Sequence, residues 1–187
     1  CVGLLEKEGL VLAKAYGRGN LLILVGADTG RDGIHGASGL ASRTFEEERE
    51  MRPTVQVGNP FLEKVLIEAC LEAVNTGYVV AMQDLGAAGL TSTVVESVAR
   101  GDSGAFIDVA LVPRREEGMT PYEVMLSESQ ERMLLVVNSE HEDSVRQIFD
   151  KWDLDSNVIG EVTEDSLVRI YDNNKLVASL PVGILTD

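Results

Sequence analysis

Residues 78–90 read Tyr-Val-Val-Ala-Met-Gln-Asp-Leu-Gly-Ala-Ala-Gly-Leu, and the rest of the chain is organised around them. The apolar residues from Tyr78 to Met82 predict a short strand, and the one carboxylate of the stretch, Asp84, comes where that strand ends. Small residues follow, and residues 91–100 have the pattern of a helix. An acid at a strand end can meet a cation, and glycines beside it let a ligand approach the backbone. The alternative is a turn in which Asp84 caps the helix.

Length and charge limit the class of protein. The 187 residues can bury one substantial core, so we predict a single domain over residues 1–187. Hydrophobic residues make up 44% and charged residues 25%, which is typical of a globular domain. The net charge of −15 argues against an electrostatic site for nucleic acid or an anionic membrane. Binding of phosphate esters would require metal ions or oriented backbone amides.

The two cysteines, Cys1 and Cys70, provide no disulfide framework, and Cys70 lies in an apolar helical pattern typical of a core residue. There is no apolar run long enough to span a membrane and no signal-peptide pattern. We therefore expect a cytoplasmic protein that binds neither nucleic acid nor membrane. The chain opens with Cys1 instead of Met, which suggests a piece of a longer protein.

Strand and helix patterns alternate along the chain. The expected strands are 2–5 and 10–13, paired as a hairpin, then 21–25, 78–82, 103–109, 133–137, 157–162, 167–171 and 175–180. The expected helices are 60–76, capped by Asn59 and closed by Gly77, then 91–100, a short helix from a capping box at 120–123, and one from a capping box at 139–142. This order predicts an α+β fold with a mixed sheet.

Three polar segments adjoin the predicted strands, and each allows two interpretations. Residues 26–39 contain five glycines, whose amides could line an anion or form a surface loop. Gln56 stands just before a helix N-terminus, where it could bind a ligand or brace the loop. Residues 127–132, Ser-Glu-Ser-Gln-Glu-Arg, could bind a polar ligand or form an exposed turn with the last two paired. His35 is interpreted as a hydrogen-bonding loop residue instead of a base or metal ligand.

Five motifs occur together in one order: TGRDGIHGAS at 29–38, QVGNPF at 56–61, QDLGAAGLTS at 83–92, REEGMTPYE at 115–123 and MLSESQERM at 125–133. Together they resemble the large synthetase subunits of phosphoribosylformylglycinamidine synthases, which act in de novo purine biosynthesis. The resemblance covers roughly residues 26–137 and corresponds to the carboxyl-side domain of that enzyme's first half.

The resemblance implies a three-layer α/β/α fold with a mixed, partly ferredoxin-like sheet, as in the C-terminal domain of aminoimidazole ribonucleotide synthetase. It implies an ATP-dependent carbon–nitrogen ligase that converts formylglycinamide ribonucleotide to formylglycinamidine ribonucleotide, with Mg²⁺ as cofactor and ATP as co-substrate. The implied partners are the preceding and following domains of the same enzyme, a glutaminase subunit that supplies ammonia, and a small accessory subunit.

The resemblance also implies roles for single residues. Gln56, Glu128, Ser129 and Gln130 match substrate-binding positions, and Asp84 matches a Mg²⁺ ligand. The family's catalytic histidine belongs to a preceding domain, so we expect no catalytic residue in this fragment and no turnover by it alone. Asn59 stands where the family more often has Asp, and it can still cap the helix.

Two other functions remain open. One is another ATP-dependent enzyme of the same superfamily, of the selenophosphate synthetase or thiamine-phosphate kinase type, although the motifs at 83–90 and 127–130 argue against it. The other is a non-catalytic assembly module, whose glycine-rich loop packs on a partner domain.

Overall fold

The structure is a computed structural model that describes residue 4, residues 9–34 and residues 56–186. The predictions for Cys1, His35 and residues 2–3 and 5–8 lie outside the described residues. The strands are β1 (Leu21–Gly26), β2 (Val79–Asp84), β3 (Gly104–Asp108), β4 (Arg132–Val137), β5 (Ser156–Thr163), β6 (Leu167–Asp172) and β7 (Lys175–Pro181). The helices are α2 (Pro60–Asn75), α3 (Gly89–Gly101), α4 (Pro121–Leu126), α5 (Glu142–Lys151) and α6 (Gly183–Thr186), with 3-10 turns η4 (Val109–Leu111) and η5 (Ser139–His141).

The strands form one mixed sheet in the order β2-β4-β1-β5-β3-β6-β7. Neighbours are antiparallel except β3 and β6, which run parallel. Taken in chain order, β1-α2-β2 and β4-α5-β5 are two strand–helix–strand units, and their strands interleave as in a ferredoxin-like sheet. The segment between them adds α3, β3 and α4. The predicted α+β class and the partly ferredoxin-like path are therefore confirmed.

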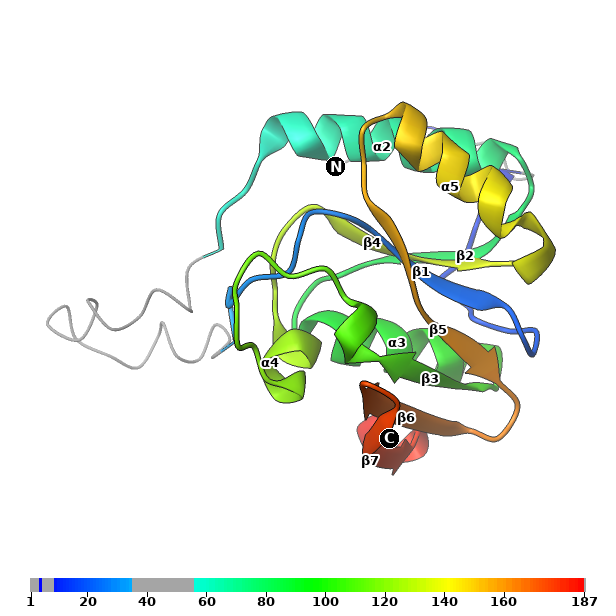
Figure 1. Ribbon diagram of the computed structural model, residues 1–187. Coiled ribbons are helices and arrows are strands. Elements are labelled where there is room, and N and C mark those ends of the chain that lie inside the picture. Colours follow the sequence, from blue (N-terminus) through cyan, green and yellow to red (C-terminus); the bar gives the residue numbers. More distant parts are fainter. Residues whose placement is uncertain (1–3, 5–8, 35–55, 187) are drawn as a thin grey trace, which may run out of the picture.

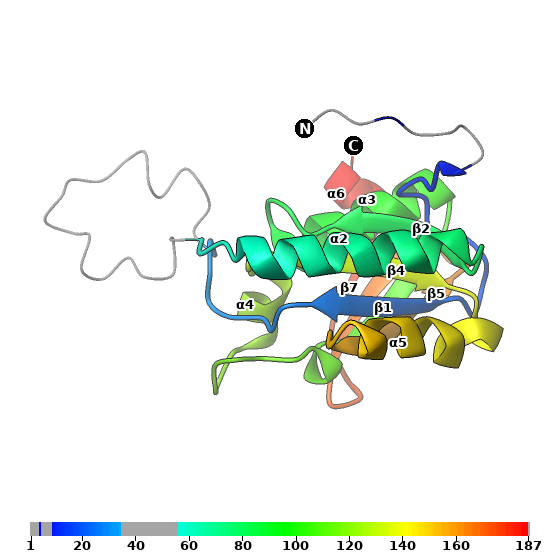
Figure 2. The ribbon, with the colours of Figure 1, turned by 90° about the horizontal axis from the view of Figure 1, so that it is seen from above.

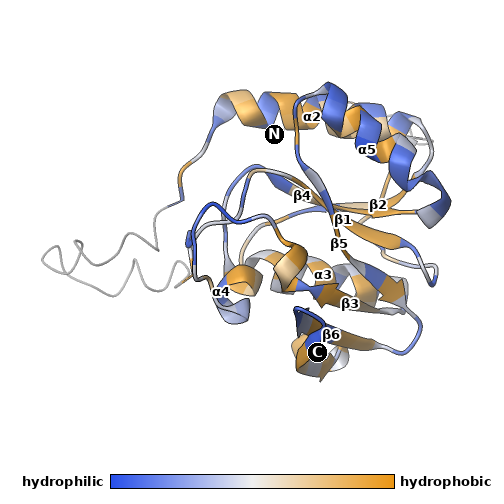
Figure 3. Cartoon of the chain, in the orientation of Figure 1, coloured by the Kyte–Doolittle hydropathy of each residue, from blue (hydrophilic) through white to orange (hydrophobic). Residues whose placement is uncertain are grey.

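Helices cover both faces of the sheet, which makes three layers. Figures 1 and 2 show α2 and α5 side by side on one face, and Figure 1 shows α3 and α4 beneath the other. Alternate residues of β1 belong to two separate cores: Leu22 and Leu24 pack on the α3 side, Ile23 and Val25 on the α2 side. A continuous apolar run is typical of a strand buried on both faces. Figure 3 shows this hydrophobic interior and the more hydrophilic outer side of α5.

Local sequence signals account for where α2 begins and ends and for where α4 begins. Asn59 Oδ1 accepts a hydrogen bond from the Leu62 amide (3.2 Å), Pro60 is the first helical residue, and Gly77 adopts a left-handed φ of 77°. Thr120 and Glu123 form the predicted capping box of α4. None of the helices within the described ranges is long and apolar enough to cross a membrane.

Cys70 is confirmed as a core residue. It is buried in the core between α2 and the sheet, and burial raises the pKa of its thiol to about 12. At neutral pH the thiol is therefore protonated, which is typical of an inert structural cysteine.

Two local predictions are wrong. Residues 10–13 form no strand; the Lys14 amide donates to Leu12 O (2.9 Å) in a tight turn. The capping box at 139–142 does not form, because Asn138 Oδ1 accepts from the Glu140 amide (2.9 Å) and starts a 3-10 turn instead. Helix α5 therefore begins at Glu142 without a side-chain cap. The Asx turn is a local alternative to a helix N-cap, in which an Asn side chain bonds the backbone two residues on.

Candidate functional site

The predicted site residues meet at one end of the sheet, where β2 ends and β4 begins. Asp84, the last residue of β2, pairs in register with Met133, and the Leu85 amide donates to Arg132 O (3.2 Å). The turn of residues 127–131 enters β4 at this point and therefore lies beside Asp84. Antiparallel pairing thus brings together two motifs that are more than forty residues apart in the sequence.

The carboxylate of Glu128 joins three segments of the chain. Its Oε1 accepts from the Ala88 amide (3.0 Å) and its Oε2 accepts from Gln56 Nε2 (2.6 Å). Glu128 is only 8% exposed and is held between the loop after β2 and the segment before α2. The Gln130 amide group turns back onto Glu128 O (2.8 Å). Glu128 therefore organises both glutamines that the sequence predicts to bind substrate, a role that sequence reasoning missed.

Ser129 lies deeper than the other predicted site residues. Its hydroxyl is buried, accepts from the Gly30 amide (2.9 Å) and donates to the Asp32 carboxylate. Arg115 also donates to that carboxylate. Asp32 and Arg115 belong to motifs quoted from the sequence, but no role was predicted for either. No sequence pattern relates these two residues, so their contact is seen only in the folded chain.

In the described part of the glycine-rich segment, three backbone amides donate hydrogen bonds to other parts of the protein. The Thr29 amide donates to Pro113 O (2.9 Å), the Gly30 amide to Ser129, and the Arg31 amide to Glu116 Oε1 (2.8 Å). Within residues 26–34 these three amides are therefore engaged with the loop after β3 and the turn before β4. The remainder of the segment, with His35, lies outside the described residues.

Asp84 does not cap the following helix. Helix α3 begins at Gly89, and its N-cap, Ala88, has φ 59° and no side-chain cap. The main-chain oxygen of Asp84 accepts from the Thr93 hydroxyl (3.0 Å), while its side chain is exposed at the strand end. The capping interpretation is wrong, and the carboxylate is open to a ligand.

The magnesium prediction fits this donor set. Mg²⁺ is usually bound through one or two carboxylates, with water and substrate phosphates completing its octahedral shell, instead of by an all-protein cage. No group of three or more His, Cys, Asp and Glu side chains that could hold a metal occurs within the described ranges. A single exposed carboxylate at Asp84 is compatible with a site of the first kind. The metal role of Asp84 stays a prediction.

Two glycines allow the turn at 127–131 to approach its neighbours. Gly89 has φ 52°, and a Cβ there would overlap the Ser127 carbonyl oxygen. Gly33 has φ 65°, and a Cβ there would fall 2.6 Å from the Cβ of Glu128. Both positions thus combine a left-handed backbone with a close approach, which only glycine tolerates.

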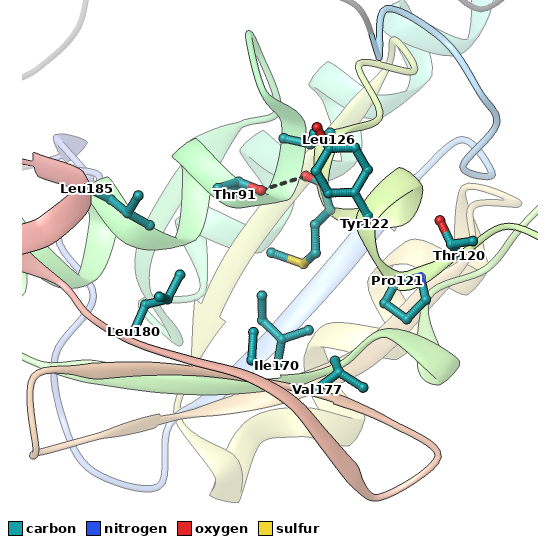
Figure 4. A pocket seen from close by; sticks show the side chains of 11 residues that line it. Thr91, Thr120, Pro121, Tyr122, Leu126, Ile170, Val177, Leu180 and Leu185 are labelled. Carbon is teal, nitrogen blue, oxygen red and sulfur yellow. Dashed lines mark hydrogen bonds between the residues drawn. The ribbon is translucent and has the colours of Figure 1, made fainter.

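A separate apolar pocket of about 500 Å³ lies between α4, the β6–β7 hairpin and α6 (Figure 4). None of the predicted site residues lines it. Its polar groups are few, mainly the hydroxyls of Thr91, Thr120 and Tyr122, and Thr91 already donates to Met125 O (3.0 Å). This lining does not suit a phosphorylated ligand, so the polar cluster at the β2–β4 end is the better candidate site.

Arg31 ties the glycine-rich segment to α4. Its Nε donates to Glu123 Oε1 (2.7 Å) and its Nη1 to Glu116 Oε2 (3.1 Å). The Thr120 amide and then the Arg31 guanidinium lower the pKa of Glu123 to about 2, below its ordinary value of 4.5. Between these values the unfolded chain binds more protons than the folded chain. The stabilisation is therefore present above about pH 4.5 and is lost as the pH falls towards 2.

We expect Glu123→Gln to flatten the fall in melting temperature between pH 4.5 and pH 2, because Gln keeps the capping box but carries no charge. At pH 7 the change should lower the melting temperature by only about 2–4 °C, since a partly exposed pair contributes about 1 kcal/mol or less. Thermal melts from pH 2 to 7 measure both effects. Asp165→Asn is the control: the pKa of Asp165 is also lowered to about 2, by Arg169, but Asp165 does not touch Arg31. An unchanged acid profile in Glu123→Gln would contradict this account.

The fold and the site define an α+β domain with a cluster of polar side chains at one end of its mixed sheet. The chain belongs to the family described as AIR synthase related protein, C-terminal domain, whose model matches residues 17–173.

Curated relatives match the chain over its whole length. A protein of Thermomicrobium roseum named phosphoribosylformylglycinamidine synthase subunit PurL is 63% identical over 187 residues, which is 100% of this chain and 25% of the relative. The protein of the same name from Moorella thermoacetica is 55% identical over 186 residues, again 25% of its length. The chain therefore spans about a quarter of the length of these relatives.

Solved structures show the same arrangement. T. maritima PurL complexed with FGAR superposes with a TM-score of 0.87 at 42% identity, covering 97% of this chain and 30% of that one. T. maritima PurL complexed with ATP has a TM-score of 0.83 at 39% identity, covering 97% and 28%. A structure described as PurLQS from Thermotoga maritima has a TM-score of 0.84 at 37% identity, covering 98% and 28%. The resemblance to the large synthetase subunits is thereby confirmed.

Proposed function

We propose that this chain is the substrate- and Mg²⁺-binding domain of an ATP-dependent ligase that converts formylglycinamide ribonucleotide to formylglycinamidine ribonucleotide. The observation that carries the proposal is the Glu128 carboxylate, which brings Gln56 and the loop after Asp84 against the turn that carries Gln130. The relatives named as PurL, and the T. maritima PurL structure complexed with FGAR, support this substrate.

Each residue has a distinct task in the proposed site. The amide groups of Gln56 and Gln130 can donate to and accept from a ribonucleotide, and they keep this ability at any physiological pH. The backbone and side chains of Glu128 and Ser129 hold the turn and present it to the substrate. Asp84 would hold Mg²⁺, which neutralises phosphate charge when bound. This division suits a chain of net charge −15, whose overall charge repels phosphates unless a cation neutralises them.

Further parts of the reaction belong to the rest of the longer enzyme. The ATP complex of T. maritima PurL supports ATP as co-substrate, and the PurLQS structure supports assembly with further subunits. We propose that these are a glutaminase and a small accessory subunit, and that the preceding domain supplies the catalytic base. The 187-residue fragment alone would then be inactive, and measurable amidine formation by it would contradict this view.

We expect Gln56→Ala and Gln130→Ala, each made in the complete enzyme, to raise the KM for formylglycinamide ribonucleotide by about 2- to 10-fold. A lost neutral hydrogen bond contributes about 0.5–1.5 kcal/mol, and more where a ligand group is left buried without a partner. Steady-state kinetics and isothermal titration with the substrate measure the effect.

The control is Gln147→Ala, because Gln147 is an exposed residue of α5 outside the proposed site. It should leave KM and melting temperature unchanged. If Gln56→Ala and Gln130→Ala lower the melting temperature by several degrees while KM stays at the wild-type value, the two residues brace the fold and the proposed substrate site is wrong.

A further inference from the structure

Arg132, the first residue of β4, is a buried cation in the middle of the candidate site. It is 2% exposed and follows Glu131, whose φ of 54° turns the chain into the strand. Its guanidinium donates in three directions: Nε to Ser129 O (2.9 Å), Nη2 to Ser127 O (2.7 Å) and Nη1 to Thr29 Oγ1 (2.9 Å). One side chain therefore links the turn before β4 to the segment after β1.

No carboxylate is paired with this guanidinium within the described residues. Asp32, the nearby acid, is bonded to Arg115 and Ser129 instead. Burial lowers the pKa of Arg132 to about 10; Asp32 opposes this effect and Arg115 adds to it. Burying a charge without a salt bridge is costly, and an apolar residue would often give a more stable fold. The buried charge of Arg132 is therefore better explained by the main-chain oxygens to which it donates than by a contribution to stability alone.

The two carbonyl groups that Arg132 holds flank the residues of the proposed substrate site. Ser127 O belongs to the peptide that enters Glu128, and Ser129 O to the peptide that enters Gln130. Fixing a peptide plane restricts where the next side chain can point. We propose that Arg132 is a positioning residue, which orients Glu128 and Gln130 for the substrate through these two carbonyl groups. The proposal rests on the function proposed above.

A lysine at position 132 cannot reproduce these three hydrogen bonds. An arginine presents five donors in a rigid planar fork, so it can bond three acceptors that lie in different directions. A lysine is a single charged point on a flexible stem and would leave at least one carbonyl without its donor. The charge is kept, but the fixed orientation of the turn is lost.

The test uses the complete enzyme with formylglycinamide ribonucleotide as the probe. For Arg132→Lys we expect KM for this substrate to rise about 10-fold or more, as for the loss of a charged hydrogen bond, with a smaller change in kcat and an unchanged KM for ATP. Thr29→Val removes only the Nη1 contact in a site that is fully buried. It should give a smaller rise, about 2- to 5-fold. This variant keeps the proposal testable if Arg132→Lys does not fold.

Ser103→Ala is the matched control for lost stability. The Ser103 hydroxyl is also buried and donates to a main-chain oxygen, Ala15 O (2.8 Å), but it lies before β3 and outside the proposed site. It should lower the melting temperature without moving either KM. If the folded Arg132 and Thr29 variants behave like Ser103→Ala, Arg132 only braces the fold and the proposal is overturned.

The outcome separates this inference from the proposed function. If wild-type enzyme does not bind the substrate, or if Gln56→Ala and Gln130→Ala bind it normally, the proposed function fails and the inference fails with it. If those two variants bind weakly while Arg132→Lys and Thr29→Val bind normally, the inference alone fails.

Discussion

Asp84→Asn should lower the kcat of the complete enzyme by about 100-fold or more while leaving its stability nearly unchanged. The carboxylate is exposed at the end of β2 and does not cap α3, so the fold does not depend on its charge. Mg²⁺ is a hard cation that prefers a charged oxygen ligand, and its contribution to phosphoryl transfer is several kcal/mol. Each 1.36 kcal/mol lost corresponds to a tenfold lower rate.

Excess Mg²⁺ should restore part of the activity, because Asn keeps one oxygen that can still coordinate the ion. Kinetics over a range of Mg²⁺ concentrations, together with thermal melts, separate binding from folding. Asp150→Asn is the control, since Asp150 is an exposed carboxylate of α5 outside the proposed site. A variant at position 84 with wild-type kcat at every Mg²⁺ concentration would remove Asp84 from the metal site.

Much of the fold could be predicted because short-range signals agree with the final packing. The apolar run of β1 indicates a strand buried on both faces, and its alternate residues do enter two different cores. Asn59 and Pro60 give the start of α2, since a cap and a fixed φ act within a few residues. Such signals act between neighbouring residues, so they do not depend on how the rest of the chain packs.

The failures have two causes, one local and one tertiary. Ser139 has the residue type for a helix N-cap, but Asn138 precedes it, accepts from the Glu140 amide and starts a 3-10 turn there instead. Ala88 and Glu131 adopt left-handed φ values of 59° and 54°, although neither is a glycine. The two turns that shape the site therefore could not be predicted from residue type. These conformations are imposed by tertiary contacts, which the sequence pattern does not contain.

The candidate site could be predicted as a set of positions but not as an arrangement. Gln56 and Glu128 are 72 residues apart in the sequence, and no residue pattern relates the segment before α2 to the turn before β4. The contacts of the buried Asp32 with Ser129 and with the more exposed Arg115 likewise draw on three distant motifs. Hydrogen-bonding residues on separate loops carry no periodicity that relates one loop to another, so only the fold assigns their partners.

Glu128→Gln should both destabilise the chain and weaken substrate binding. The carboxylate accepts two hydrogen bonds, from the Ala88 amide and from Gln56 Nε2. A glutamine has one oxygen and one NH₂ group, so one of these donors would face another donor at a nearly buried position. A buried polar group left without a partner costs about 1–3 kcal/mol. We therefore expect the melting temperature to fall by about 3–10 °C and the KM for formylglycinamide ribonucleotide to rise about tenfold.

A double-mutant cycle with Gln56→Ala tests whether the two effects share one cause. If Glu128 acts by holding Gln56, the losses in substrate affinity should be non-additive, with a coupling of about 0.5–3 kcal/mol. Glu72→Gln is the matched control, because its carboxylate also accepts from two groups, Lys151 Nζ and Trp152 Nε1. Glu72 lies in the last turn of α2, whereas the site adjoins the first turn. This variant should cost stability without changing KM. Additive losses at Gln56 and Glu128 would mean that each residue meets the substrate independently and that the carboxylate does not organise the site.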